Sequence, residues 1–148
     1  MTRTLATGFA LACSLAFLGA GARAAAPPPL PPQPKIVPAG IPAGYVLVSP
    51  CVRQMGEHWA NLKAPLNGTV LYGTYRGQVI FSEVMLTPKD FAAGKSFLDL
   101  KPLPGHTIDH VDIQHTNGHP GMEFSHYDIH AYYIPASAVA KICPTAPM

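Results

Sequence analysis

The feature that most constrains the fold is the stretch of residues 106–134, which holds six of the seven histidines of the chain. Polar residues in it alternate with apolar ones, and alternate side chains of an extended chain lie on the same face. The pattern occurs twice, in His110, Asp112 and Gln114 and again in His126, Asp128 and His130. We therefore predict two strands, each with a polar face, in a chain with only 12% charged residues.

These two strands are expected over residues 107–115 and 124–134, joined by a loop rich in glycine, asparagine and proline. If His110 lay opposite His130, the two polar faces would be side by side. A shift by one residue would put them on opposite faces of the sheet. The other face of the second strand carries Tyr127, Ile129, Ala131 and Tyr133 and is predicted to face the core.

Converging imidazole and carboxylate groups suit a transition metal, with zinc or copper favoured. The predicted ligands are His110, His126, Asp128 and His130, and the best set is His126, His130 and one of the other two. Possible further ligands, or groups that orient a ligand, are Glu57, His58 and Asp112. His106, His115 and His119 lie in or beside turns and are expected to be exposed. The alternative is a hydrogen-bonded polar seam or a subunit contact without metal.

The N-terminus resembles a secretory signal peptide over residues 1–24, with an apolar run too short for a typical membrane span and an Ala-Arg-Ala end. A proline-rich linker is predicted over residues 25–44 and one globular domain over residues 45–148. The expected location is the periplasm or the extracellular medium.

Charge argues against two classes of partner. Cleavage would remove two of the ten basic residues, Arg3 and Arg23, and leave eight against eight acidic residues. Nucleic acids and anionic membranes both require a basic patch, which the mature chain lacks. We therefore expect neither a nucleic-acid partner nor a membrane partner after the signal peptide is cleaved.

Cysteine usage agrees with export. Cys13 would leave with the signal peptide, and Cys51 and Cys143 would remain. Two cysteines in an oxidising compartment most simply form one disulfide. By closing a long loop, this bond would stabilise the fold by about 4 kcal/mol on the chain-entropy model. Two thiolate metal ligands are the alternative, without a Cys-x-x-Cys pair to support it.

The rest of the domain reads as an α+β fold, mainly antiparallel sheet with one or two short helices. Strands are expected over residues 45–48, 69–75 and 78–86, with a turn at Arg76-Gly77. Residues 55–61 are predicted to form a loop because Gly56 interrupts them. Thr87 and Pro88 start a short helix that ends near Gly94. Glu83 is unusual in an apolar strand, and either orients a ligand histidine or lies at an exposed end.

Several segments together resemble a known protein family. They are Gly56-Glu57-His58-Trp59, the hairpin Tyr72-Gly73-Thr74-Tyr75-Arg76-Gly77, Glu83-Val84-Met85-Leu86, Pro104-Gly105-His106 and His126-Tyr127-Asp128-Ile129-His130-Ala131-Tyr132-Tyr133. The chain is similar, from about Tyr45 to Pro135, to small exported bacterial proteins with an uncharacterised domain. A thermophile protein controlled by an extracytoplasmic-stress sigma factor (sigma-E) typifies the family. The resemblance implies a compact β-rich domain and self-association, and no established activity. Family members often have Phe where Ala131 stands, so another residue would have to fill that space in a core.

Three functions are compatible with the sequence. One is a metal-binding, non-catalytic protein of the cell envelope, which suits the histidines and the lack of a Gly-x-Ser-x-Gly nucleophile motif. A metal-dependent enzyme is the second, with Asp112, Asp128 or Glu57 as general base. The third is a structural homo-oligomer without metal, whose histidines tune an interface near pH 6.5.

Overall fold

The computed structural model describes residues 29–65, 68–98, 100–120 and 122–146. The predicted signal peptide, the first four residues of the predicted linker and the last two residues of the chain lie outside these ranges. No helix in the described part of the chain is both long enough and apolar enough to cross a membrane.

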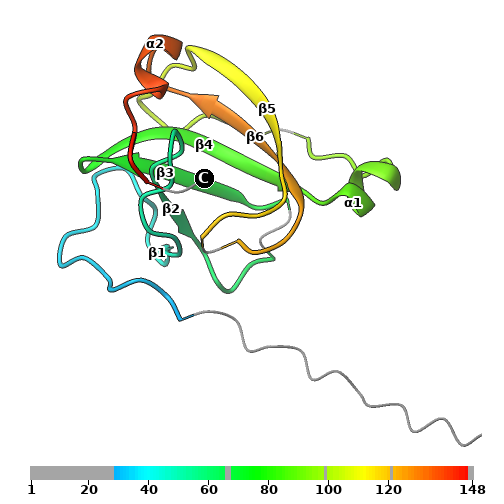
Figure 1. Cartoon of the computed structure of the whole chain (residues 1–148), viewed down its shortest axis with the longest axis horizontal. Coiled ribbons are helices and arrows are strands. Elements are labelled where there is room, and N and C mark those ends of the chain that lie inside the picture. The colour runs from blue at the N-terminus through cyan, green and yellow to red at the C-terminus, as the bar shows by residue number, and fades with distance from the viewer. Residues whose placement is uncertain (1–28, 66–67, 99, 121, 147–148) are drawn as a thin grey trace, which may run out of the picture.

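A six-stranded antiparallel sheet forms the domain, with two short helices, as the α+β prediction expects (Figure 1). The strand order is β1-β2-β3-β4-β6-β5, so β1 and β5 are the edges. The strands are β1 (Val46–Leu47), β2 (Glu57–Ala60), β3 (Val70–Tyr75), β4 (Gln78–Leu86), β5 (His110–Thr116) and β6 (His126–Tyr132). The helices are α1 (Pro88–Ala92) and α2 (Ala136–Val139).

The β3–β4 hairpin follows the prediction closely, and β4 has the predicted bounds. Arg76 and Gly77 both have positive φ angles, 51° and 77°, which suit the right-handed twist of a two-residue hairpin. Beyond the hairpin, Thr87 caps α1 by accepting a hydrogen bond from the backbone N–H of Asp90. The cap and Pro88 at the first turn form as predicted.

The prediction of a loop over residues 55–61 is wrong, because this segment contains β2. Gly56 adopts a positive φ of 76° and ends a tight turn, after which the chain pairs with β3 and β1. Only four residues are extended, too few to show alternation. The β3 strand that stabilises them begins ten residues further along the chain.

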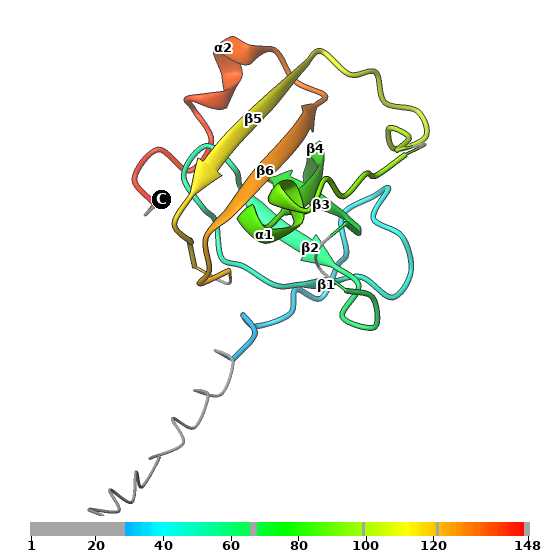
Figure 2. The same cartoon turned by 90° about the vertical axis from the view of Figure 1, so that its right-hand side faces the viewer.

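The chain reaches the far edge of the sheet after β4. It passes through α1 and the irregular segments 93–98 and 100–109, and then forms β5 outside β6 (Figure 2). This crossover leaves β6 between β4 and β5, paired with both. The polar strand β6 is therefore interior to the sheet.

The β5–β6 register places His110 opposite Tyr132, Asp112 opposite His130 and Gln114 opposite Asp128. This is two residues away from the register considered from the sequence, so the polar residues of both strands still lie on one face. The prediction of which face is buried is wrong. His126, Asp128, His130 and Tyr132 are buried, whereas Tyr127, Ile129 and Ala131 are partly exposed.

Two apolar clusters pack on the face that carries the β6 histidines. One is Val52, Met55, Ile80, Phe81, Tyr132, Ile142 and Cys143, and the other is Val48, Ala60, Leu71, Met85 and Met122. The predicted disulfide joins Cys51 to Cys143 across 92 residues. It holds the C-terminal segment against the first cluster, which contains Cys143 and contacts Cys51.

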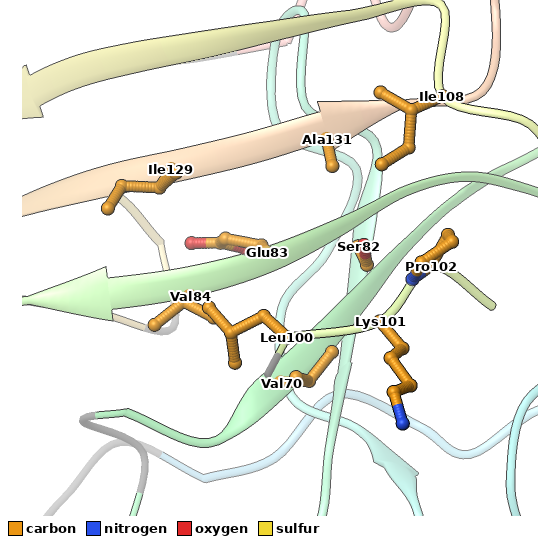
Figure 3. A pocket seen from close by; sticks show the side chains of 10 residues that line it. All are labelled: Val70, Ser82, Glu83, Val84, Leu100, Lys101, Pro102, Ile108, Ile129 and Ala131. Atoms are coloured by element: carbon orange, nitrogen blue, oxygen red, sulfur yellow. The ribbon is translucent and has the colours of Figure 1, made fainter. Parts of the chain in front are cut away.

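The opposite face of β3, β4 and β6 is covered by residues of the crossover segment. Between them lies a cavity of about 60 Å³, lined by Val70, Ser82, Glu83, Val84, Leu100, Lys101, Pro102, Ile108, Ile129 and Ala131 (Figure 3). Ala131 is the smallest side chain of the lining. A larger residue at that position would reduce the cavity.

The proline-rich segment runs alongside the sheet where the structure describes it. The Gln33 side chain donates to the Leu47 carbonyl at 2.8 Å and accepts from the Leu47 N–H at 2.9 Å. An amide side chain thus covers part of the β1 edge, whose backbone groups would otherwise be unpaired.

Candidate metal centre

Six ionisable side chains meet beneath the sheet, between the two apolar clusters. They are His58, Glu83, His119, His126, Asp128 and His130, hereafter the buried cluster. Each is at most 3% exposed. Charged and polar groups are rarely buried to this extent unless they are paired or bind a metal.

Three strands and one loop supply these groups. His58 comes from β2 and Glu83 from β4, while β6 supplies three residues at alternate positions. Glu83 is paired directly with His130. His119 comes from the loop after β5, where its backbone pairs with that of Met122. Sheet register therefore fixes five of the six groups.

The first triad consists of His58, Glu83 and His130. One potential ligand atom from each lies within 4.8 Å of the other two. Oε2 of Glu83 is 3.6 Å from Nε2 of His58 and 3.9 Å from Nε2 of His130. These distances are longer than hydrogen bonds and leave room between the groups.

The second triad consists of His119, His126 and Asp128. Here too, one potential ligand atom from each residue lies within 4.8 Å of the other two. Nε2 of His126 is 2.9 Å from Oδ1 of Asp128. Each triad thus offers two imidazoles and one carboxylate, a set that binds transition metals and leaves further coordination positions open.

Ring contacts and carboxyl groups connect the triads. The His58 and His119 rings stack with centroids 5.1 Å apart. The carboxyl groups of Glu83 and Asp128 are neighbours, close enough for the charge of Asp128 to raise the pKa of Glu83. The six side chains therefore form one continuous site.

Outer partners fix the ring orientation of three histidines. Nδ1 of His126 is 2.5 Å from the Phe124 carbonyl oxygen, and Nδ1 of His119 is 3.3 Å from the Pro120 carbonyl oxygen. Because a carbonyl only accepts, Nδ1 carries the proton in both rings. Nδ1 of His58 is 2.7 Å from Ser49 Oγ, whose hydroxyl donates to the Pro50 carbonyl. All three rings can then present a bare Nε2 to the cluster, as metal-bound histidines do.

The inward atoms lack hydrogen-bond partners among the described residues. These atoms are Nε2 of His58, His119 and His126, both ring nitrogens of His130, and all four carboxylate oxygens of Glu83 and Asp128. Among them, Nε2 of His126 and Oδ1 of Asp128 lie 2.9 Å apart and form an ion pair when the ring is protonated, although their geometry falls short of a hydrogen bond. Buried polar atoms almost always have partners, so nine together require an explanation. A bound cation would satisfy them.

The pKa values of the two buried carboxyl groups shift in opposite directions. Burial, reinforced by the charge of Asp128, raises the pKa of Glu83 well above its usual value. Burial also acts to raise the pKa of Asp128, but the neighbouring His126 and Glu83 outweigh it and bring that pKa to about 2. Asp128 is thus the more acidic of the two carboxyl groups.

Burial lowers the pKa of three of the histidines. It places the pKa of His58 well below the usual value, lowers that of His119, and brings that of His130 to about 4. Burial acts the same way on His126, but Asp128 and the Phe124 carbonyl outweigh it and raise the pKa. Three imidazoles are therefore neutral at pH 7, the form that binds metals.

The predicted ligands divide between the cluster and the rest of the sheet. His126, Asp128, His130 and His58 lie in the cluster. His110 lies outside both triads. Its ring stacks on that of Tyr132 with centroids 4.8 Å apart, and its Nδ1 is 2.9 Å from Oδ1 of Asp109. The Asp112 side chain is half exposed, and Glu57 accepts a hydrogen bond from Thr74.

Two members of the buried cluster were not predicted as metal ligands from the sequence. His119 was expected to be exposed, and this was wrong because the loop folds back and buries its ring against His58 and His126. Glu83 is buried, not at an exposed strand end. Its occurrence in an apolar strand was the one available signal, whereas His119 gave none.

Comparison with known proteins gives a fold and no function. No protein-family model and no curated protein matches the chain. Among solved structures it is similar to the hypothetical protein TTHB210 from Thermus thermophilus, with 18% identity and a TM-score of 0.51. The match covers 64% of this chain and 86% of that one. The likeness supports the α+β fold alone.

Proposed function

We propose that this protein is an exported, non-catalytic module of the cell envelope that binds a transition metal ion in the buried cluster. The single observation that carries the proposal is the set of nine buried nitrogen and oxygen atoms without hydrogen-bond partners among the described residues. They converge as imidazole and carboxylate groups with metal-site spacing. Zinc and copper suit this nitrogen and oxygen set best.

Electrostatics supports a divalent cation at this position. The two carboxyl groups offer negative charge to a bound cation, whereas without it the charge of Asp128 favours protonation of Glu83. A metal that binds Nε2 of His126 would displace a proton from that ring, so metal binding is expected to release protons.

Burial favours a binding role over catalysis. All six side chains are at most 3% exposed, so a substrate could not reach the ion without movement of the covering loops. A catalytic metal site needs an open position that a substrate can approach. The proposed enzyme alternative would require that such an opening exists in solution.

Export rests on the resemblance of residues 1–24 to a signal peptide and on the disulfide between Cys51 and Cys143. Membership of the exported bacterial family with the uncharacterised domain is part of the same proposal, based on the sequence motifs. Fractionation of the host cell, with detection of a processed chain in the periplasm or medium, tests export.

Self-association is proposed through the edge strand β5. Its Val111 and Ile113 side chains are 56% and 71% exposed, and an edge strand has unpaired backbone groups that a second copy could pair. Light scattering on the purified protein should give a mass above that of the monomer. Ile113→Lys should lower that mass, and a monomeric wild-type protein would contradict the proposal.

Elemental analysis of the purified protein tests metal binding. We expect near-stoichiometric zinc or copper in the wild type, and loss of this metal in a His126→Ala, His130→Ala variant. A matched His106→Ala, His115→Ala variant removes two histidines outside the cluster and should retain the metal. A wild-type protein that stays metal-free after incubation with zinc and copper would contradict the proposal.

A further inference from the structure

We infer that the buried cluster holds two metal ions side by side, one in each triad; this rests on the proposed metal binding. The first ion would be bound by His58, Glu83 and His130. The second would be bound by the second triad, His119, His126 and Asp128. Each ion would have two imidazoles and one carboxylate.

The arrangement of ligands argues for a pair. Each triad brings its own three ligand atoms within 4.8 Å of one another, which is the requirement for one ion. The triads adjoin along two contacts, the stacked rings of His58 and His119 and the neighbouring carboxyl groups of Glu83 and Asp128. Two-metal sites place their ions about 3.5–4 Å apart, and carboxylates at the boundary reduce the repulsion between them.

One ion alone would leave part of the cluster unsatisfied. An ion in the first triad would not reach Nε2 of His119, which is buried and has no hydrogen-bond partner in the described part of the chain. An ion in the second triad would leave Nε2 of His58 in the same state. Occupation of both triads gives each of the six side chains a partner, as buried polar groups require.

Sheet geometry separates the two sites while keeping them adjacent. His130 and Asp128 are alternate residues on one face of β6, so they lie about 7 Å apart along the strand. His130 is paired with Glu83, whereas Asp128 is paired with Met85. The strand therefore gives His130 to the first triad and both His126 and Asp128 to the second.

Metal titration of the purified full-length protein, stripped of metal by a chelator, measures the number of sites. Zinc and cobalt(II) are the probes, with bound metal counted by mass spectrometry and cobalt followed by its visible absorption. We expect saturation at two ions per chain. Saturation at one ion would overturn the pair and leave the proposed metal binding intact, whereas binding of none would contradict both.

Variants assign each ion to its triad. His130→Ala should retain one ion through the second triad, and His119→Ala should retain one through the first. The double variant should retain none, and His115→Ala, outside the cluster, should retain two. If either single variant lost all metal while keeping its circular dichroism spectrum, the two-site assignment would be wrong.

Electron paramagnetic resonance of the copper(II)-loaded wild type tests adjacency without any substitution. Two neighbouring copper(II) ions couple, so the integrated signal should fall below that of two isolated ions, or a half-field transition should appear. Two bound ions with the full signal of isolated copper and no half-field transition would overturn the inference that the ions lie side by side.

Discussion

His130 of β6 lies directly opposite Glu83 of β4, with Nε2 of the histidine 3.9 Å from Oε2 of the glutamate and neither side chain exposed to solvent. Cross-strand neighbours in a buried sheet face are normally apolar or hydrogen-bonded. Here the two groups are too far apart for a hydrogen bond, and neither has another hydrogen-bond partner among the described residues. An unpaired arrangement of this kind is the basis of the metal-binding proposal.

Glu83→Met should make the metal-free protein more stable. The histidines around Glu83 have lowered pKa values and stay neutral, so an apolar side chain there leaves no uncompensated positive charge. A buried polar group without a hydrogen-bond partner costs about 1–3 kcal/mol, and an apolar side chain of similar size removes that cost. We expect a rise of several degrees in the Tm of the metal-free form and a smaller Tm increase on adding zinc.

Glu57→Met is the matched control for this variant, because Glu57 lies outside the cluster and bonds to Thr74. It should leave the zinc-dependent increase in Tm unchanged. A lower Tm of metal-free Glu83→Met would contradict the view that this carboxyl group is held for a ligand at a cost in stability.

Ser49→Ala should weaken metal binding without removing a ligand. Ser49 Oγ lies 2.7 Å from Nδ1 of His58 and accepts the backbone N–H of the same residue. Loss of such an outer partner reduces metal affinity about 10- to 100-fold. Competition with a zinc chelator measures the change. Ser125→Ala, at a serine that contacts exposed His115, should retain wild-type affinity.

Acidification should destabilise the metal-free protein between about pH 6.5 and pH 4. His58, His119 and His130 have lowered pKa values in the fold, so the unfolded chain binds more protons in this range. The raised pKa of Glu83 acts in the opposite direction, but it is a single group and the three histidines outweigh it. His126, with a raised pKa, loses its contribution only as pH rises above about 6.5.

Urea unfolding at a series of pH values measures this dependence. The free energy of unfolding should fall steadily as the pH is lowered from about 6.5 to about 4. Constant or increasing stability over that range would show that the histidines are not buried in the neutral form.

Gly73→Ala should disturb both packing and the site. A Cβ atom at Gly73 would lie 2.1 Å from the Phe81 ring, which contacts His58 and His130 with ring centroids 5.7 and 4.5 Å away. Overpacking of this kind costs about 1–3 kcal/mol. We expect a lower free energy of unfolding and weaker zinc binding, both measured against wild type.

A second substitution separates crowding from a backbone effect. Phe81→Leu in the Gly73→Ala background removes the ring atoms nearest the new methyl group, and should recover part of the lost stability. If the double variant were less stable than the sum of the two single changes, the steric explanation would fail.

Local signals made much of the fold predictable. The β-branched residues of β4, the Arg76-Gly77 turn and the Thr87 cap act through neighbours in the sequence, and all three form as expected. Strand β2 was not recognised because its extended structure depends on distant partners in β1 and β3.

The candidate site was only partly predictable. Alternation identified His126, Asp128 and His130, because period-two spacing fixes a shared face whatever the register. It did not show that this face is the buried one, since polar residues usually face solvent and the ligands on β2 and β4 come from far away in sequence. His110 follows the same pattern, yet β5 is an edge strand and places it beside Tyr132.

A crystal structure of the zinc-loaded protein, with anomalous difference density collected at the zinc edge, tests the metal-binding claim most directly. We expect density between the imidazoles and carboxylates of the buried cluster, about 2.0–2.2 Å from the ligand atoms. Density only at histidines outside the buried cluster, such as His106 or His110, with none among His58, His126 and His130, would contradict it.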